Sequence, residues 1–133
     1  MDKIEIERFV GRWLNAVTSG NSSEFEHLVA EVVFDENSRQ ETRPAAFRER
    51  AQAVNRAFSP LAGQVDELLI DGDRIAWRWT LSGTHSGPFL GEPATGKPVR
   101  LSGTNFQRLA GGRVVAHYTL VDVAGALRQI RGA

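Results

Sequence analysis

Hydrophobic positions in the first half of the chain recur at helical spacing. The pattern predicts a helix over Lys3–Thr18, a short helix from Glu24 to about Ala30, and a third helix from Pro44 to Phe58, where Ser59-Pro60 stops it. Between the last two, Glu31–Asp35 is β-branched and aromatic and predicts a short strand. The polar stretch Glu36–Arg43 predicts a loop.

The second half changes to a period of two. Strands are predicted over Gln64–Asp71, from Arg74 through Leu81, over Val99–Leu109 and over Arg113–Val121, with a short closing helix that contains Leu127 and Ile130. Tight glycine turns at Gly72 and at Gly111-Gly112 join neighbouring strands, and a loop covers Ser86–Lys97. Helices grouped before hairpins indicate a single α+β domain over residues 1–133, with an antiparallel sheet.

Composition narrows the function classes. The 133 residues carry 16 Lys+Arg against 16 Asp+Glu and no cysteine, which excludes thiolate metal sites and argues against nucleic acid as a partner. The first residues carry scattered charges and do not resemble a signal peptide. No uninterrupted apolar run approaches the roughly 20 residues that a membrane span needs. We therefore expect a cytoplasmic protein without a membrane partner. The three histidines lack a ligand spacing, so neither a metal nor a cofactor is predicted.

One motif is misleading. Residues Gly91–Lys97 match the first seven positions of a phosphate-binding loop, but Pro98 stands where Ser or Thr would hold Mg²⁺. A phosphate-binding loop also opens a helix, whereas the residues after Lys97 alternate like a strand. We interpret the segment as a glycine-rich connection between strands.

Asp122 is the first candidate for chemistry. Every second residue of a strand points to the same face, and Asp122 follows Tyr118 and Leu120 at this spacing. If the alternation is uninterrupted, Asp122 therefore faces the interior. A partly desolvated carboxylate there is suited to act as a general base. The alternative is a purely structural role, because Asp122 also precedes the closing helix and can be its N-cap.

The histidines and aromatic residues are the other candidates. His85 continues the apolar parity of the strand before it and can serve as an acid, a base or a hydrogen-bond donor, or be structural. His117 falls on the face opposite Asp122 if the strand has no bulge, a face that suits an oligomer surface. A cavity for a flat, oxygenated ligand, as opposed to plain core, would be lined by Trp13, Trp79, Phe89, Asn105, Gln107 and Tyr118.

The stretch Trp79–Lys97, with its Gly83-Thr84-His85, Gly87-Pro88-Phe89 and Pro93-to-Lys97 segments, resembles the SnoaL-like polyketide (ester) cyclases. So do Gly112–Tyr118 and Asp122. The resemblance implies the nuclear transport factor 2-like fold, a cone-shaped α+β barrel with three helices packed in a curved sheet, a deep pocket, and a homodimer formed through the outer face of the sheet. It also implies a cofactor-independent aldol closure, with Asp122 as general base. Such a reaction needs hydrogen-bond donors that hold the negative charge of the enolate, and His85, Asn105 and Gln107 are the candidates for this role.

Three functions therefore compete. The leading hypothesis is a cyclase or isomerase that acts on a hydrophobic, oxygenated small molecule. Epoxide hydrolysis would need two carboxylates that share an arginine, and only Asp122 with Arg78 or Arg108 offers a partial match. The third hypothesis is a non-catalytic pocket protein in which Asp122 only caps the helix.

Overall fold

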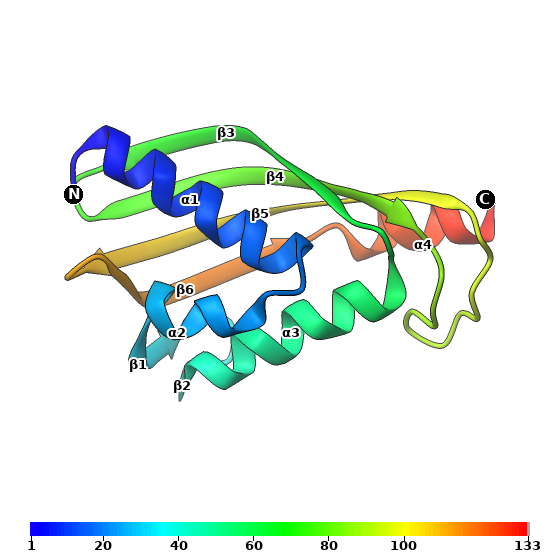
Figure 1. Cartoon of the computed structure of the whole chain (residues 1–133), viewed down its shortest axis with the longest axis horizontal. Coiled ribbons are helices and arrows are strands. Elements are labelled where there is room, and N and C mark those ends of the chain that lie inside the picture. Colours follow the sequence, from blue (N-terminus) through cyan, green and yellow to red (C-terminus); the bar gives the residue numbers. More distant parts are fainter. Residues whose placement is uncertain (133) are drawn as a thin grey trace.

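One curved, unclosed sheet organises the chain, which the computed structural model describes over residues 1–132. Within that range six strands pair in the order β2-β1-β6-β5-β4-β3 (Figure 1). They are β1 (Val29–Asp35), β2 (Gln40–Thr42), β3 (Ala62–Asp71), β4 (Arg74–Thr84), β5 (Pro98–Ala110) and β6 (Arg113–Val121).

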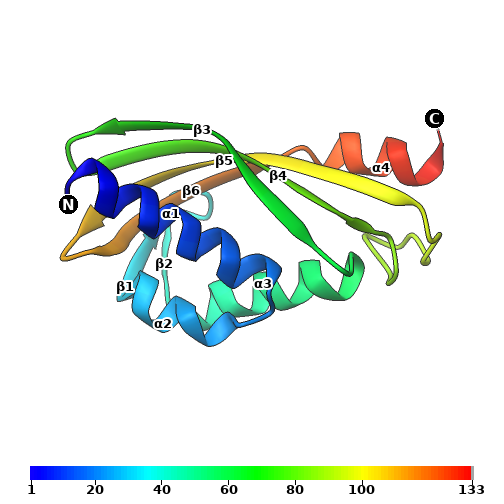
Figure 2. The same ribbon diagram turned by 45° about the horizontal axis from the view of Figure 1, so that its top comes forward.

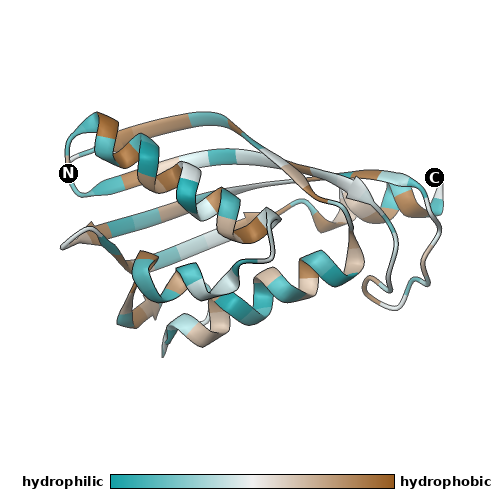
Figure 3. Ribbon diagram, in the orientation of Figure 1, coloured by the Kyte–Doolittle hydropathy of each residue, from teal (hydrophilic) through white to brown (hydrophobic). Residues whose placement is uncertain are grey.

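Helices cover the concave face of this sheet. They are α1 (Lys3–Thr18), α2 (Phe25–Leu28), which a 3₁₀ turn at Ser22–Glu24 precedes, and α3 (Pro44–Ala57). Figure 2 shows α1 and α3 as a layer beneath the sheet, while α4 (Val123–Arg131) lies at the far end, against β5. Hydrophobic and polar residues alternate along α1 and α3 (Figure 3), because each helix buries one stripe against the sheet.

The predicted α+β class and the curved sheet with three N-terminal helices and a short C-terminal helix are confirmed. The prediction of a purely antiparallel sheet is wrong, because β1 pairs with β6 in parallel. These strands are far apart in sequence, so no hairpin turn fixes their relative direction. The short strand β2 lies inside the predicted loop Glu36–Arg43 and pairs with β1.

A β-bulge in β6 decides which side chains face the interior. Leu109 pairs with Val114 and Arg108 with Ala116, so that Val115 is left as the extra residue. A bulge of this kind reverses the two faces of every later residue in the strand. From Ala116 onward the concave face therefore receives His117, Thr119 and Val121.

The prediction that Tyr118 and Asp122 face the interior, with His117 on the other side, is wrong for this reason. Tyr118 instead meets Phe106 on the convex face, with ring centroids 6.1 Å apart. Asp122 is exposed at the start of α4, and His117 is buried.

The loop between β4 and β5 carries the misleading motif. Residues 91–97 open no helix, since β5 begins at Pro98. The Nζ of Lys97 donates instead to the carbonyl oxygen of Ile130, at the end of α4. Within residues 1–132, no helix combines the length and apolar character that a membrane crossing requires.

Candidate functional site

A cavity of about 290 Å³ lies between the concave face of the sheet and helices α1 and α3. Its walls are mostly apolar, and all three tryptophans of the chain, Trp13, Trp77 and Trp79, line it. The polar residues on its wall are Arg50, Asn105, His117 and Thr119. An apolar pocket with a few convergent polar groups is the usual form of a small-molecule site.

His117 is held in the cavity wall by aromatic neighbours. Its ring stacks on Trp13, with centroids 5.5 Å apart and planes 22° apart, and meets the edge of Phe47 at 5.1 Å. The side chain is only 4% exposed. Burial lowers the pKa of His117, and the positive charge of Arg50 lowers it further. The negative charge of Asp35 acts in the opposite direction but is weaker, so the pKa falls to about 4. The imidazole is therefore neutral at neutral pH.

Asn105 lies on the neighbouring strand, opposite Thr119. Its Oδ1 accepts hydrogen bonds from Trp79 Nε1 at 3.2 Å and from Thr119 Oγ1 at 2.8 Å. Its Nδ2 has no hydrogen-bond partner within residues 1–132, and the residue lines the cavity. The amide nitrogen is therefore free to donate to a ligand.

Arg50 projects from α3 with its side chain half exposed, which places the guanidinium at the cavity opening. It donates to Asp35 Oδ2 at 3.2 Å and lies 5.1 Å from the centre of the Phe47 ring. Burial alone would raise the pKa of Asp35, but the Asn37 amide and Arg50 outweigh it and lower that pKa. Asp35 is therefore an ionised anchor for Arg50.

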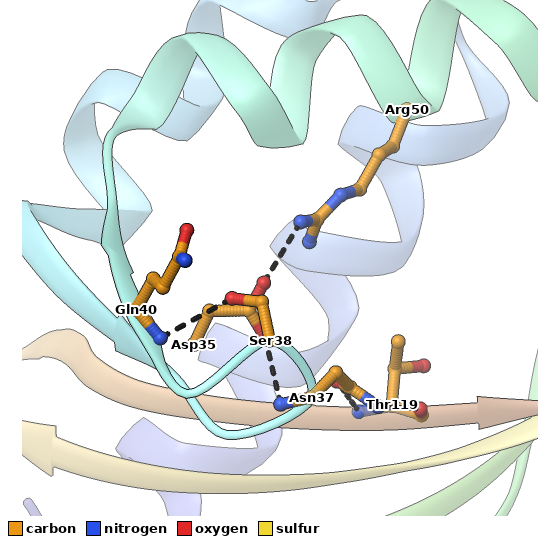
Figure 4. A network of polar contacts seen from close by, with 6 residues as sticks. All are labelled: Asp35, Asn37, Ser38, Gln40, Arg50 and Thr119. Atoms are coloured by element: carbon orange, nitrogen blue, oxygen red, sulfur yellow. Dashed lines mark hydrogen bonds and ion pairs between the residues drawn. The ribbon is translucent and has the colours of Figure 1, made fainter.

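The turn after β1 ties this ion pair to β6 (Figure 4). The backbone N–H of Asn37 donates to Asp35 Oδ1 at 2.9 Å. The Asn37 side chain accepts from the Thr119 N–H at 2.9 Å and donates to the Thr119 carbonyl oxygen at 2.8 Å. One turn thus fixes both Arg50 and the strand that carries His117 and Thr119.

The model of the SnoaL-like polyketide cyclase family matches residues 7–130. The chain belongs to this family. Among curated proteins, none matches it.

Solved structures share the fold. TsrD from Streptomyces laurentii superimposes with a TM-score of 0.89 at 22% identity, over 100% of this chain and 99% of that one. A proposed polyketide cyclase from Acidithiobacillus ferrooxidans superimposes with a TM-score of 0.84 at 24% identity, over 100% of this chain and 99% of that one. IdmH from Streptomyces antibioticus, also a proposed polyketide cyclase, superimposes with a TM-score of 0.80 at 24% identity, over 94% of this chain and 97% of that one. At these identities the likeness establishes the fold alone.

The structure brings together some of the residues predicted for the site of this family member. Trp13, Trp79 and Asn105 line the cavity. Gln107 is buried directly behind it, between Trp77 and His117. Phe89 lies away from the cavity, where it packs on Phe58 with ring centroids 4.9 Å apart.

Neither residue predicted to be catalytic lines the cavity. Asp122 Oδ1 accepts from the Gly125 N–H at 2.9 Å and so caps α4. His85 is fully buried at the end of β4, where its Nδ1 accepts from the Thr95 N–H at 3.2 Å. Its Nε2 is buried without a partner within residues 1–132. His85 thereby holds the loop 86–97, and a catalytic role for either residue stays a prediction.

Arg50, His117 and Thr119 were missed by sequence reasoning. Only the placement of the bulge brings His117 and Thr119 inward. The apolar run Val114-Val115-Ala116 interrupts the alternation at this place and is the signal that could have indicated the bulge. Arg50 sits between Phe47 and Ala51 on an amphipathic helix, a position that usually faces solvent.

No group of His, Cys, Asp and Glu side chains within residues 1–132 could hold a metal ion. Among the residues that the structure describes, Arg50 pairs with one carboxylate, that of Asp35. Epoxide hydrolysis by two carboxylates that share an arginine therefore finds no support at this opening.

Proposed function

We propose that this SnoaL-like protein binds a hydrophobic, oxygen-bearing small molecule in the cavity and catalyses, without a cofactor, its ring closure or isomerisation through an enolate. The observation that carries the proposal is the cavity itself, an apolar chamber whose polar groups are Arg50, Asn105, His117 and Thr119. Asn105 Nδ2 and His117 Nε2 have no hydrogen-bond partner within residues 1–132. Membership of the SnoaL-like polyketide cyclase family supports the reaction class.

The required chemistry matches these groups. When a carbon between two carbonyl groups loses a proton, negative charge develops on a carbonyl oxygen. Hydrogen-bond donors already aimed at that oxygen stabilise the transition state, and loss of one such donor typically costs about 10²–10³ in kcat. Asn105 Nδ2 and His117 can supply the donors, and Arg50 adds a positive charge at the opening. The apolar walls strengthen each of these interactions by excluding water.

Two carboxylates are candidates for the proton acceptor. Asp35 contacts Arg50 at the cavity opening, and Asp122 matches the position that the family resemblance suggests. Neither carboxylate is part of the cavity wall itself, so each would have to reach the ligand from the edge of the cavity. The variants Asp35→Asn and Asp122→Asn separate them, because each keeps the shape of the side chain and removes its charge. Asp122 is the acceptor if its amide variant loses turnover and keeps ligand binding. For Asp35 the loss must also exceed that of Arg50→Met, because Asp35 anchors Arg50 as well.

A fluorescence titration tests binding directly, because every tryptophan of the chain lines the cavity. Flat β-ketoesters and β-diketones are added, their binding is followed by quenching, and turnover is followed by mass spectrometry. Asn105→Leu is expected to bind the turned-over compound and lose about 10²-fold or more in kcat. Tyr118→Phe, on the convex face, is the matched control. Wild-type turnover in Asn105→Leu, or quenching by none of the compounds, would contradict the proposal.

We also propose that the convex face pairs with a second copy of the chain. Leu69, Ala76, Phe106 and Tyr118 are successive partners across β3, β4, β5 and β6, so they form one apolar row. Leu69 and Phe106 in that row are 62% and 53% exposed. Phe106→Asp should convert a dimer to a monomer in light scattering, whereas Leu90→Asp, at a position outside the row that is 64% exposed, should not. A monomeric wild type would refute the dimer.

A further inference from the structure

We infer that the side chains behind the cavity lock His117 as a neutral donor through Nε2, so that His117 and Asn105 together hold an oxygen that only accepts hydrogen bonds. The ligand class that fits is the enolate or carbonyl form of a β-dicarbonyl compound, and Trp77 and Gln107 are the positioning residues. As a statement about turnover the inference rests on the proposed function; as a statement about ligand preference it does not.

The lock begins at Trp77, whose indole nitrogen can only donate. Trp77 Nε1 lies 3.0 Å from Gln107 Oε1, so the oxygen of that amide faces the indole and its NH₂ group faces His117. Gln107 Nε2 lies 3.1 Å from His117 Nδ1. Since the NH₂ group donates, Nδ1 must accept, and the proton of the neutral ring sits on Nε2.

Nε2 has no hydrogen-bond partner within residues 1–132, although His117 lines the cavity. The ring nitrogen is therefore open to a ligand, as an N–H. The charged groups that act on this ring are Arg50, which disfavours protonation, and Asp35, which favours it. Burial adds to the effect of Arg50, so the ring stays neutral and a donor through the physiological pH range.

A second tryptophan orients the side chain of Asn105, which lies two residues before Gln107 on β5. Trp79 Nε1 also only donates, so Asn105 Oδ1 faces it, and Thr119 gives its hydroxyl hydrogen to the same oxygen. The side chain can offer only its NH₂ group to the cavity. Gly103 makes this arrangement possible, because a Cβ there would lie 2.4 Å from the Trp79 ring.

Asn105, His117 and Arg50 thus all present N–H groups to the cavity. A carbonyl or enolate oxygen satisfies such groups completely. An ammonium group cannot accept from them, and a hydroxyl group accepts through its oxygen but brings a hydrogen that needs an acceptor of its own. A buried site built for one hydrogen-bonding type rejects the opposite type strongly, because its own groups are left unpaired. The site should therefore bind a ligand that bears carbonyl groups more tightly than the corresponding alcohol.

The test combines ¹⁵N NMR of histidine-labelled protein with ligand competition. The wild-type ring should carry its proton on Nε2 at every pH from about 6 to 9. Benzoylacetone should quench tryptophan fluorescence with a Kd at least about tenfold lower than its diol, 1-phenylbutane-1,3-diol. Gln107→Leu removes the donor to Nδ1 and should both mix the two tautomers and erase most of that preference. Tyr118→Phe should change neither.

A wild-type proton on Nδ1, or equal affinity for the dione and the diol, would overturn the inference. The wild-type measurements need no variant, so a poorly folded Gln107→Leu protein does not remove the test. Absence of turnover with both wild-type results as expected would refute the proposed function and leave the binding preference standing.

Discussion

Burial of His117 should make the stability of the protein depend on pH in a way that one variant removes. The pKa of the ring is 6.5 in the unfolded chain and about 4 in the folded one. Between these values the unfolded state binds a proton that the folded state excludes, so stability falls as pH drops through this window. Above about pH 6.5 the stabilisation is complete, and below about pH 4 the two states are protonated alike.

The size of the effect follows from the shift. At about 1.4 kcal/mol for each pKa unit, the wild type should lose about 3 kcal/mol of unfolding free energy between pH 7 and pH 4 through this residue alone. His117→Gln has no such group, while every carboxylate is common to both proteins. The difference between their pH profiles therefore isolates the ring.

Urea denaturation followed by tryptophan fluorescence at several pH values measures both profiles. His117→Gln itself will be less stable at neutral pH, because it loses the contacts with Trp13 and Phe47. Its profile should nevertheless be flatter than that of the wild type over the window. Parallel profiles would show that His117 takes up its proton in the folded state as readily as in the unfolded one, and would refute the neutral buried ring.

Further predictions concern the residues that support the site. Asp122→Ala should lose about 1 kcal/mol of stability as the cap of α4 is removed, while Asp122→Asn should lose less; equal losses in chemical denaturation would argue against the cap. Gly103→Ala places a methyl group 2.4 Å from the Trp79 ring and 2.8 Å from the Leu120 carbonyl oxygen, so it should cost about 1–3 kcal/mol and shift tryptophan emission; an unchanged spectrum and stability would contradict the close packing. Arg50→Met should raise the pKa of Asp35 in an NMR titration, because it removes one of the groups that lower it; an unchanged Asp35 titration would exclude the ion pair.

Much of the fold was accessible from the sequence because its elements carry strong local signals. The apolar stripe of α1 and the alternation of β4 and β5 survive in the structure with nearly the predicted bounds. Trp79 and Asn105 share one face of the sheet because β4 and β5 pair without a bulge along their shared length. The family resemblance then supplied the curved sheet and its helices.

The site could be predicted only in part because two long-range features decide it. A single extra residue, Val115, reverses the face of every later position in β6. As a result the side chain of His117, and not that of Asp122, faces the interior. The parallel pairing of β1 with β6 brings Asp35 beside His117, which lies far away in sequence, and Asp35 in turn holds Arg50. Neither feature follows from local periodicity, because each depends on which strands meet.

A crystal structure of the protein with benzoylacetone bound tests the central claim most directly. We predict one oxygen of the ligand within about 3 Å of both Asn105 Nδ2 and His117 Nε2, with its phenyl ring among the tryptophans of the cavity. Density for the ligand beside Asp122, or an empty cavity at a ligand concentration that saturates the fluorescence change, would contradict it.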